Sequence, residues 1–387
     1  MNSHLKLIHK DGQKPQRCNR CVMDLRVDPF LRFNDGGVCN HCLRYDKLLP
    51  IRTVSGDDAK EKLNKIVSAI KRRGSTAEYD CIVGMSGGLD STYVVYLAKK
   101  LGLRPLAVHV DNGWNTEFAI RNIERAVKAL GIDLVTHVLD WREFVDVQRS
   151  FLLASTPDGE IPTDHAIVSV VWREAIQRGI KYFLTGMNFA TESIHVPHWV
   201  YGHYDWKYIR AVHHRYGSVS LRNYPHCNFL YLTLYASGIR GIRSVSPLNY
   251  IDYKKAEIVQ LLQKELGWQE YGGKHHESIY TRFYQGYLLP KKFGIDKRTG
   301  HLSDLINAGQ LTREVAITKL QEEPYPTKDQ LADITYVCKR LNLSPAEFGN
   351  ILQAECRTYR DFPNAEWQEN IVRGILTTLR KFRMYPQ

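Results

Sequence analysis

The sequence predicts an α/β protein with a doubly wound parallel sheet, preceded by a zinc ribbon and followed by a mainly helical region. Short apolar segments alternate with longer amphipathic segments, which is the pattern of parallel strands covered by helices on both faces. Two closely spaced pairs of cysteines stand before this region. The expected strands are residues 79–85, 104–110, 133–139 and 182–186, and the expected helices are residues 57–73, 92–102, 116–130 and 164–178.

Length and composition are those of a large globular protein. The chain has 387 residues, enough for about two domains and a small appendage. We expect a ribbon in residues 1–50, a core domain in residues 51–250 and a mainly helical region in residues 251–387. An aromatic-rich insertion at about 193–240 could stack bases, but we favour an irregular segment that covers a pocket or forms an oligomer contact.

The net charge of +12 favours anionic partners, either nucleic acid or phosphorylated small molecules. The basic residues are spread along the chain and form no long tail, which weakens the case for nucleic acid. No apolar run approaches the ~18 residues of a membrane span, and the first residues contain no apolar core of a secretion signal. We therefore expect a cytoplasmic protein without a membrane span.

Four of the eight cysteines form two CxxC pairs, Cys18 with Cys21 and Cys39 with Cys42. Two such pairs separated by a short hairpin are typical of a zinc ribbon, in which four thiolates complete a tetrahedron. An iron–sulfur cluster or redox-active dithiols are the alternatives. We favour structural zinc, because the metal supplies folding energy that so short a segment lacks, and we expect His41 to be a bystander.

The segment from Ser86 to Ser91 reads Ser-Gly-Gly-Leu-Asp-Ser and joins the first expected strand to a helix. Gly87 and Gly88 allow a tight turn, and the start of the helix favours an anion, most often a phosphate. No lysine follows the glycines, which excludes a Walker loop, and the third glycine of a dinucleotide fingerprint is missing. Asp90 opens the helix beside this turn.

Two further segments carry candidate ligand-binding residues. Asp111 follows the second expected strand, at the sheet edge where such proteins bind ligands. The turn of residues 271–275 places Lys274 beside two glycines, which suits a grip on phosphate. A solvated charged face would explain the charges of this region but not the glycine pair.

The Ser-Gly-Gly-Leu-Asp-Ser loop resembles that of the PP-loop ATP pyrophosphatases, which cleave ATP between its α and β phosphates. Together with the paired CxxC motifs, Thr185–Glu192, Tyr271–Arg298 and His301-Leu302-Ser303, it resembles the N-acetyl sugar amidotransferases from about residue 18 to about residue 320. These enzymes of bacterial surface-glycan assembly, including O-antigen of lipopolysaccharide, convert an acetamido group to an acetamidino group.

The resemblance implies ATP, Mg²⁺ and structural Zn²⁺ as cofactors and assigns roles to individual residues. Asp90, Lys274 and Ser86 would be catalytic, with Asp90 near the magnesium ion and Lys274 countering charge on the phosphates. The nucleotide would be bound by Ser86, Gly87, Gly88, Asp90, Ser91, Asp111, Gly186 and Asn188, and the zinc by Cys18, Cys21, Cys39 and Cys42. Glu192 is a further candidate for a phosphate or metal contact.

The resemblance also implies a nucleotide-linked N-acetyl sugar as substrate and a separate glutaminase with a cyclase-like barrel subunit as the source of ammonia. The main rival is a tRNA-modifying PP-loop enzyme, either a thiolase or a lysidine-type ligase. It would share the loop, the adenylation chemistry and the basic charge. A zinc-ribbon binding protein with an inactive nucleotide fold is disfavoured, because every expected polar position of the loop is intact.

Overall fold

The computed structural model describes residues 16–274 and 276–381. The N-terminal segment considered for a secretion signal and His275 of the glycine turn therefore lie outside the described residues. Five parallel strands form one sheet in the order β3-β2-β1-β4-β5. The strands are β1 (Cys81–Gly84), β2 (Pro105–Asp111), β3 (Asp133–Val138), β4 (Tyr182–Leu184) and β5 (Arg243–Val245).

The strand order creates a switch point beside the central strand. The chain runs from β1 outward through β2 to β3 and then returns to the other side of β1 as β4 and β5. Loops that leave β1 and β4 therefore diverge at the carboxyl edge of the sheet, which is where open α/β sheets bind their ligands. The glycine-rich loop leaves β1 at this edge.

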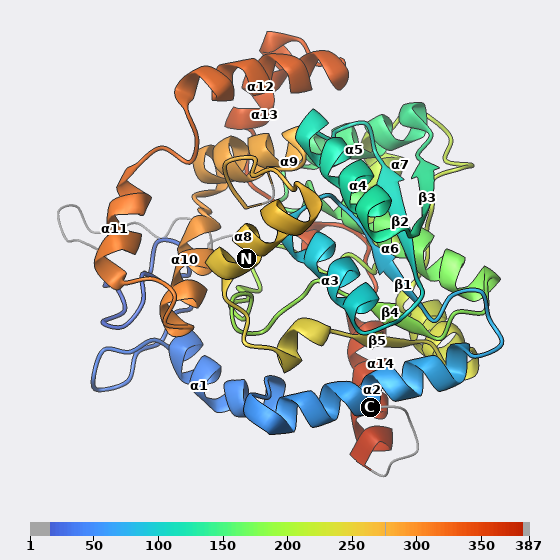
Figure 1. Ribbon diagram of the computed structural model, residues 1–387. Coiled ribbons are helices and arrows are strands. Elements are labelled where there is room, and N and C mark those ends of the chain that lie inside the picture. The colour runs from blue at the N-terminus through green and yellow to red at the C-terminus, as the bar shows by residue number, and fades with distance from the viewer. Residues whose placement is uncertain (1–15, 275, 382–387) are drawn as a thin grey trace.

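Helices cover both faces of the sheet, as the alternating sequence pattern predicts (Figure 1). One face is covered by α2 (Gly56–Gly74), α3 (Leu89–Lys100), α4 (Glu117–Leu130) and α8 (Lys255–Leu266), whose buried side chains form one core cluster with the strands. The other face packs against α5 (Trp141–Ala154) and α6 (Ile161–Gln177), and α7 (Trp206–Tyr216) packs on α5. The doubly wound α/β fold is thereby confirmed.

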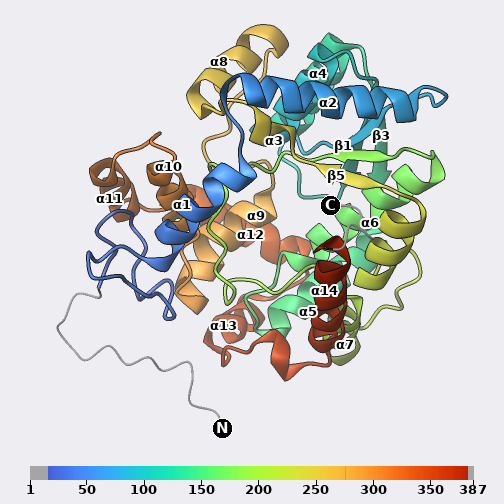
Figure 2. The ribbon, with the colours of Figure 1, turned by 90° about the horizontal axis from the view of Figure 1, so that it is seen from below.

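The chain after the sheet is mainly helical, as expected. It contains η2 (Pro247–Tyr250), α9 (Ile279–Phe283), η3 (Tyr284–Phe293), α10 (Arg298–Asn307), α11 (Arg313–Gln321), α12 (Thr327–Arg340), α13 (Pro345–Gln353), η4 (Tyr359–Asp361) and α14 (Glu366–Lys381). The ribbon and α1 (Asn40–Arg52) lie beside α10 and α11 (Figure 2). In the part of the chain that the structure describes, no helix is long and apolar enough to cross a membrane.

Two helices of this region begin with different kinds of N-cap. Ser344 caps α13 through reciprocal hydrogen bonds with Glu347, which form a capping box. Pro326 is the N-cap of α12, and Thr327 already lies inside that helix. Proline has no side-chain acceptor, so it fixes the backbone entry to α12 without a capping hydrogen bond.

Candidate active site and metal centre

The glycine-rich loop between β1 and α3 has the geometry of an anion-binding turn. Gly87 has a φ of +80°, and a Cβ atom there would lie 2.3 Å from the carbonyl oxygen of Ala119, so the turn requires glycine. Ser86 Oγ accepts a hydrogen bond from Gly88 N at 3.2 Å, and Ser91 Oγ accepts one from Ser86 N at 3.3 Å. These bonds hold the loop at the first turn of α3, whose dipole favours an anion.

A cavity of about 290 Å³ lies over this loop, and segments from distant parts of the chain wall it. Lys274 Nζ lies 2.8 Å from Glu192 Oε1, so both side chains predicted to meet the phosphates are paired at the wall. Tyr253 donates a hydrogen bond to Asp90 Oδ1. Burial and the neighbouring Asp90 carboxylate raise the pKa of Tyr253, which keeps this phenol protonated as the donor.

A second cavity of about 450 Å³ adjoins the first and shares Ser86, Gly186 and Glu277 with it. It opens along the carboxyl ends of β1, β2 and β4. Its wall includes a polar cluster. Glu160 Oε2 accepts a hydrogen bond from Gln285 Nε2 at 2.8 Å and another from Lys297 Nζ at 3.0 Å. Two adjoining polar cavities at the switch point provide room for more than one ligand.

The structure brings most of the predicted nucleotide-binding residues together. Those that line the first cavity are Ser86, Gly88, Asp90, Ser91, Gly186, Glu192 and Lys274. The sequence analysis assigned no role to Tyr253 or His301, which line the same cavity. Their proximity to the loop depends on folding across the whole chain, and no local spacing signals it.

Three predicted nucleotide-binding residues, Gly87, Asp111 and Asn188, line neither cavity. Asp111 Oδ1 accepts a hydrogen bond from Gly113 N at 2.9 Å and so shapes the turn after β2. Asn112 and Asn115 of the same segment line the second cavity. Asn188 Oδ1 accepts from both Thr191 N and Thr191 Oγ1 at 2.8 Å. Asp111 and Asn188 therefore shape the loops around the site.

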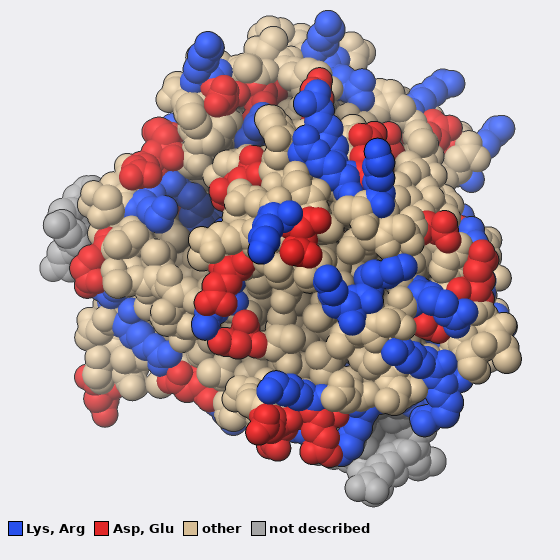
Figure 3. All heavy atoms as spheres, viewed as in Figure 1, with Lys and Arg blue, Asp and Glu red and all other residues tan. Residues whose placement is uncertain are grey.

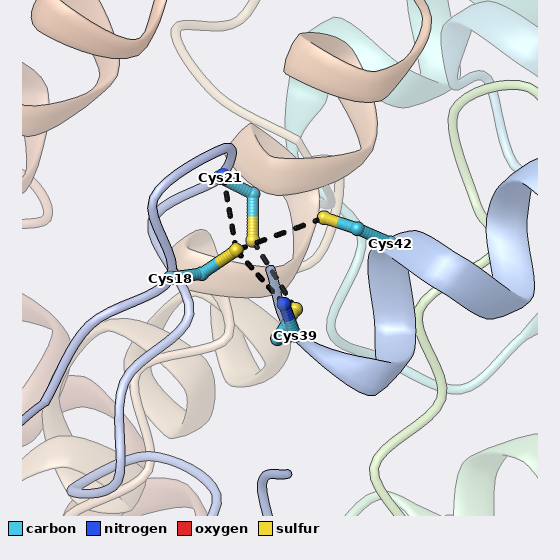
Figure 4. Close-up of side chains that lie close together, drawn as sticks. All are labelled: Cys18, Cys21, Cys39 and Cys42. Carbon is cyan, nitrogen blue, oxygen red and sulfur yellow. Dashed lines mark hydrogen bonds between the residues drawn. The ribbon is translucent and has the colours of Figure 1, made fainter. Parts of the chain in front are cut away.

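The four paired cysteines converge on one point (Figure 4). All are buried, and their sulfur atoms lie within 4.8 Å of one another, with 3.7 Å between Cys21 and Cys39 and 4.0 Å between Cys18 and Cys42. A tetrahedral zinc ion with Zn–S bonds of about 2.3 Å places its sulfurs about 3.8 Å apart. The set therefore fits zinc, and His41 instead bonds to Asp28 at 2.7 Å.

The surroundings of the cysteines also suit a bound metal. Cys18 Sγ accepts hydrogen bonds from Cys39 N at 3.2 Å and from Cys21 N at 3.4 Å, and such bonds stabilise a thiolate. Asn307 Oδ1 lies 3.3 Å from Cys42 Sγ, while Asn307 Nδ2 is buried without a partner among the described residues. Turning this amide over would let Nδ2 donate to a Cys42 thiolate, which resolves the unpartnered atom.

Helix α10 joins the ribbon to the active site. On one side Ser303 Oγ accepts from Val22 N at 3.3 Å, and Asn307 contacts Cys42. On another side His301 and Leu305 line the first cavity. The ribbon therefore supports a helix that forms part of the cavity wall, which the sequence analysis did not foresee.

The cysteines outside the ribbon are poorly suited to nucleophilic chemistry. Cys81 and Cys227 are buried, and Cys338 and Cys356 are half-buried on separate elements. Burial raises the pKa of all four thiols, so the reactive thiolate is disfavoured at each. Sulfur transfer by a thiolase would need at least one reactive thiol near the nucleotide.

The surface charges do not form one extended basic patch on the face seen in Figure 3. Lysine and arginine side chains are scattered there among aspartate and glutamate side chains. A nucleic-acid-binding face would be expected to gather its cations into a stripe or patch. This distribution agrees with the spread of basic residues along the sequence.

The sequence matches two known families. Residues 277–373 match "LPS biosynthesis protein WbpG-like, C-terminal domain", and residues 80–185 match "Queuosine biosynthesis protein QueC", a PP-loop family. The second match begins at β1 and includes the glycine-rich loop. The two matches confirm the predicted resemblance to PP-loop proteins of lipopolysaccharide biosynthesis. A comparison with curated protein sequences found no match.

Two solved structures resemble this chain, with low sequence identities and low TM-scores. One is the NMN synthetase from Francisella tularensis, with 16% identity and a TM-score of 0.35 over 74% of this chain and 94% of that chain. The other is a predicted subunit of tRNA methyltransferase from Methanocaldococcus jannaschii DSM. It has 19% identity and a TM-score of 0.28 over 47% of this chain and 74% of that chain.

Proposed function

We propose that this chain, a PP-loop protein with a WbpG-like lipopolysaccharide-biosynthesis domain, converts an acetamido group of a nucleotide-linked sugar to an acetamidino group. The first cavity carries the proposal. It is lined by Ser86 and Asp90 of the PP-loop and by Glu277, His301 and Leu305 of the WbpG-like domain. ATP chemistry and the recognition of a glycan precursor would therefore share one space.

The reaction must first activate the amide carbon of the acetamido group, which is a poor electrophile. Transfer of AMP from ATP to the amide oxygen releases pyrophosphate and gives an O-adenylyl imidate. Ammonia then adds to the imidate carbon and AMP departs with the former amide oxygen. Bound Mg²⁺ would neutralise phosphate charge during the first step. The remaining contributions come from residues of the chain.

The loop residues are placed to serve the first step. Ser86, Gly88 and Ser91 would hold the departing pyrophosphate at the first turn of α3, where the helix dipole stabilises it. Asp90 would lie near the metal once Tyr253 gives up its hydrogen bond. The polar cluster of Glu160, Gln285 and Lys297 lines the adjoining cavity and would offer hydrogen bonds to a polar substrate there.

Lys274→Ala should lower turnover about 100-fold with little change in the melting temperature, because one preorganised cation at a charged transition state contributes about that much. Lys274 pairs with Glu192 at the cavity wall, so its replacement should leave the apolar core intact. Steady-state AMP release would be compared with that of Lys254→Ala, whose ion pairs lie with exposed Asp252 and Glu257. Equal turnover in both variants would show that the glycine-lysine turn is only a surface loop.

The isolated chain should use ammonium salts and fail to use glutamine. A glutaminase needs a cysteine thiolate with a partnered base. The four cysteines outside the ribbon have raised pKa values, and no hydrogen bond among the described residues joins one of their thiols to a histidine or carboxylate. A separate glutaminase with a cyclase-like barrel subunit would then supply ammonia. The assay provides ATP, Mg²⁺, sugar and either nitrogen source, and amidine formation from glutamine without a partner would contradict the prediction.

The alternative is a tRNA-modifying PP-loop enzyme, which the QueC-like core also permits. The two functions differ in what triggers AMP formation. With ammonium present, nucleotide-linked acetamido sugars should stimulate AMP release and bulk tRNA should not. Stimulation by tRNA together with an electrophoretic shift of tRNA would favour the alternative.

A further inference from the structure

The side chain of Glu192 is oriented on both of its oxygen atoms. Oε1 accepts a hydrogen bond from Lys274 Nζ at 2.8 Å, and Oε2 accepts one from Asn188 N at 3.3 Å. Glu192 belongs to the loop that follows β4, and it lines the first cavity together with Lys274. The position of this loop therefore decides where both charged groups stand in the cavity.

The two residues directly after Glu192 bind a buried carboxylate of α10. Ser193 Oγ donates a hydrogen bond to Asp304 Oδ1, and Ile194 N donates one to Asp304 Oδ2 at 3.1 Å. Ser193 is 6% exposed and Asp304 is 1% exposed, so water does not compete for these bonds. Both oxygen atoms of Asp304 are thus used to fix the chain next to Glu192.

Asp304 is a costly residue to keep at this depth. Burial raises the pKa of its carboxyl group to about 6, while the bonds from Ser193 and Ile194 and the nearby Lys274 act in the opposite direction. No ion pair compensates its charge among the described residues, and an unpaired buried carboxylate destabilises a fold. Perturbed carboxylates of this kind gather at functional sites.

The same loop is also anchored by α1, which begins at the second cysteine pair. Arg44 Nη1 donates a hydrogen bond to the carbonyl oxygen of Ser193 at 3.0 Å. The ring of Tyr45 stacks on that of Phe189, with 5.6 Å between the ring centres. Arg44 and Tyr45 lie within one helical turn of Cys42, and α1 lies beside α10 (Figure 2). The ribbon and α10 therefore hold the loop at separate points.

We propose that Asp304 is a positioning residue of the active site, which fixes the loop after β4 so that Glu192 and Lys274 meet the phosphates and metal ion of bound ATP. The inference rests on the proposed function, because it takes the first cavity as the ATP site. Asp304 itself lines neither cavity and acts through Glu192. Removing such an outer partner typically lowers metal affinity or activity by about 10- to 100-fold.

Nucleotide binding by the full chain tests the proposal without the sugar. Ser193→Ala removes one of the two bonds to Asp304 and should weaken binding of the magnesium complex of α,β-methylene-ATP about 10-fold in isothermal titration calorimetry. Asp304→Asn, which keeps the size of the side chain and removes its charge, should weaken binding at least as much. The zinc content of both variants should stay at the wild-type value.

Ser150→Ala is the matched control. Ser150 is also a buried serine, and its hydroxyl group donates a hydrogen bond to the carbonyl oxygen of Asp146 within α5, away from both cavities. This variant should bind the nucleotide like the wild type, and its melting temperature should be close to that of Ser193→Ala. Wild-type affinity in folded Ser193→Ala and Asp304→Asn would overturn the proposal.

A double-mutant cycle separates positioning from a general structural role. If the contact acts through Glu192, Ser193→Ala should weaken binding by less than about 2-fold when Glu192→Gln is already present, which is the usual limit of additivity. An equal loss in both backgrounds would overturn the proposal while the proposed function stands. A wild-type chain that binds no nucleotide would overturn the proposed function and this inference together.

Discussion

Asp90→Ala should abolish AMP formation, with a loss of at least about 1000-fold, because the variant removes the carboxylate expected beside the magnesium ion. The fold should survive, since Asp90 lines a cavity at the start of α3 and is not part of the apolar core. Release of AMP and pyrophosphate would be measured together with circular dichroism and the melting temperature. Ser86→Ala should also lower AMP formation while the protein stays folded, but by a smaller factor.

A matched control for this result is Asp58→Ala. Asp58 lies in the exposed first turn of α2, so its removal also deletes one carboxylate near a helix N-terminus but leaves the cavity intact. This variant should keep wild-type activity. Appreciable AMP formation by folded Asp90→Ala would contradict the assigned role of the loop.

Cys39→Ser should have the largest effect on stability, because it removes one of four ligands from the centre of the ribbon. Structural zinc supplies about 10–16 kcal/mol of apparent binding energy in small zinc-finger peptides. Losing part of it should lower the melting temperature by about 10 °C or more. Metal analysis of the wild type should give about one zinc per chain, and the variant should give much less.

The same substitution should also weaken nucleotide binding, because the ribbon supports α10 at the cavity wall. Cys356→Ser is the control, since Cys356 is a half-buried thiol far from the ribbon in sequence and makes one bond to the Lys292 carbonyl. Its zinc content and melting temperature should stay near the wild-type values. Iron with a visible charge-transfer band in the wild type would contradict the assignment of zinc.

The sheet was predictable where its strands are buried apolar runs. β2 and β3 were placed within one residue at each end, because each run is bounded by residues that break strands. β5 was missed, since Arg243, Ser244 and Val245 form no apolar run and pair with β4 through the backbone. α5 was also missed, although Asp140 caps it by accepting from Arg142 N and Glu143 N.

The site was predictable where its residues are close in sequence. The loop from Ser86 to Ser91 and the CxxC pairs are local patterns, and the structure places each set in one compact group. The bond from Tyr253 to Asp90 and the contact between Val22 and Ser303 join residues far apart along the chain. Only the packing of α8 and α10 against the core brings those groups together.

Isotope transfer tests the central claim most directly. The substrate would be a nucleotide-linked sugar whose acetamido oxygen is a heavy isotope, supplied with ATP, Mg²⁺ and ammonium. The account predicts that the heavy oxygen appears in AMP and that the sugar exchanges one oxygen atom for one NH group, both followed by mass spectrometry. AMP without the label, or a sugar product that retains its acetamido oxygen, would contradict adenylation of the amide.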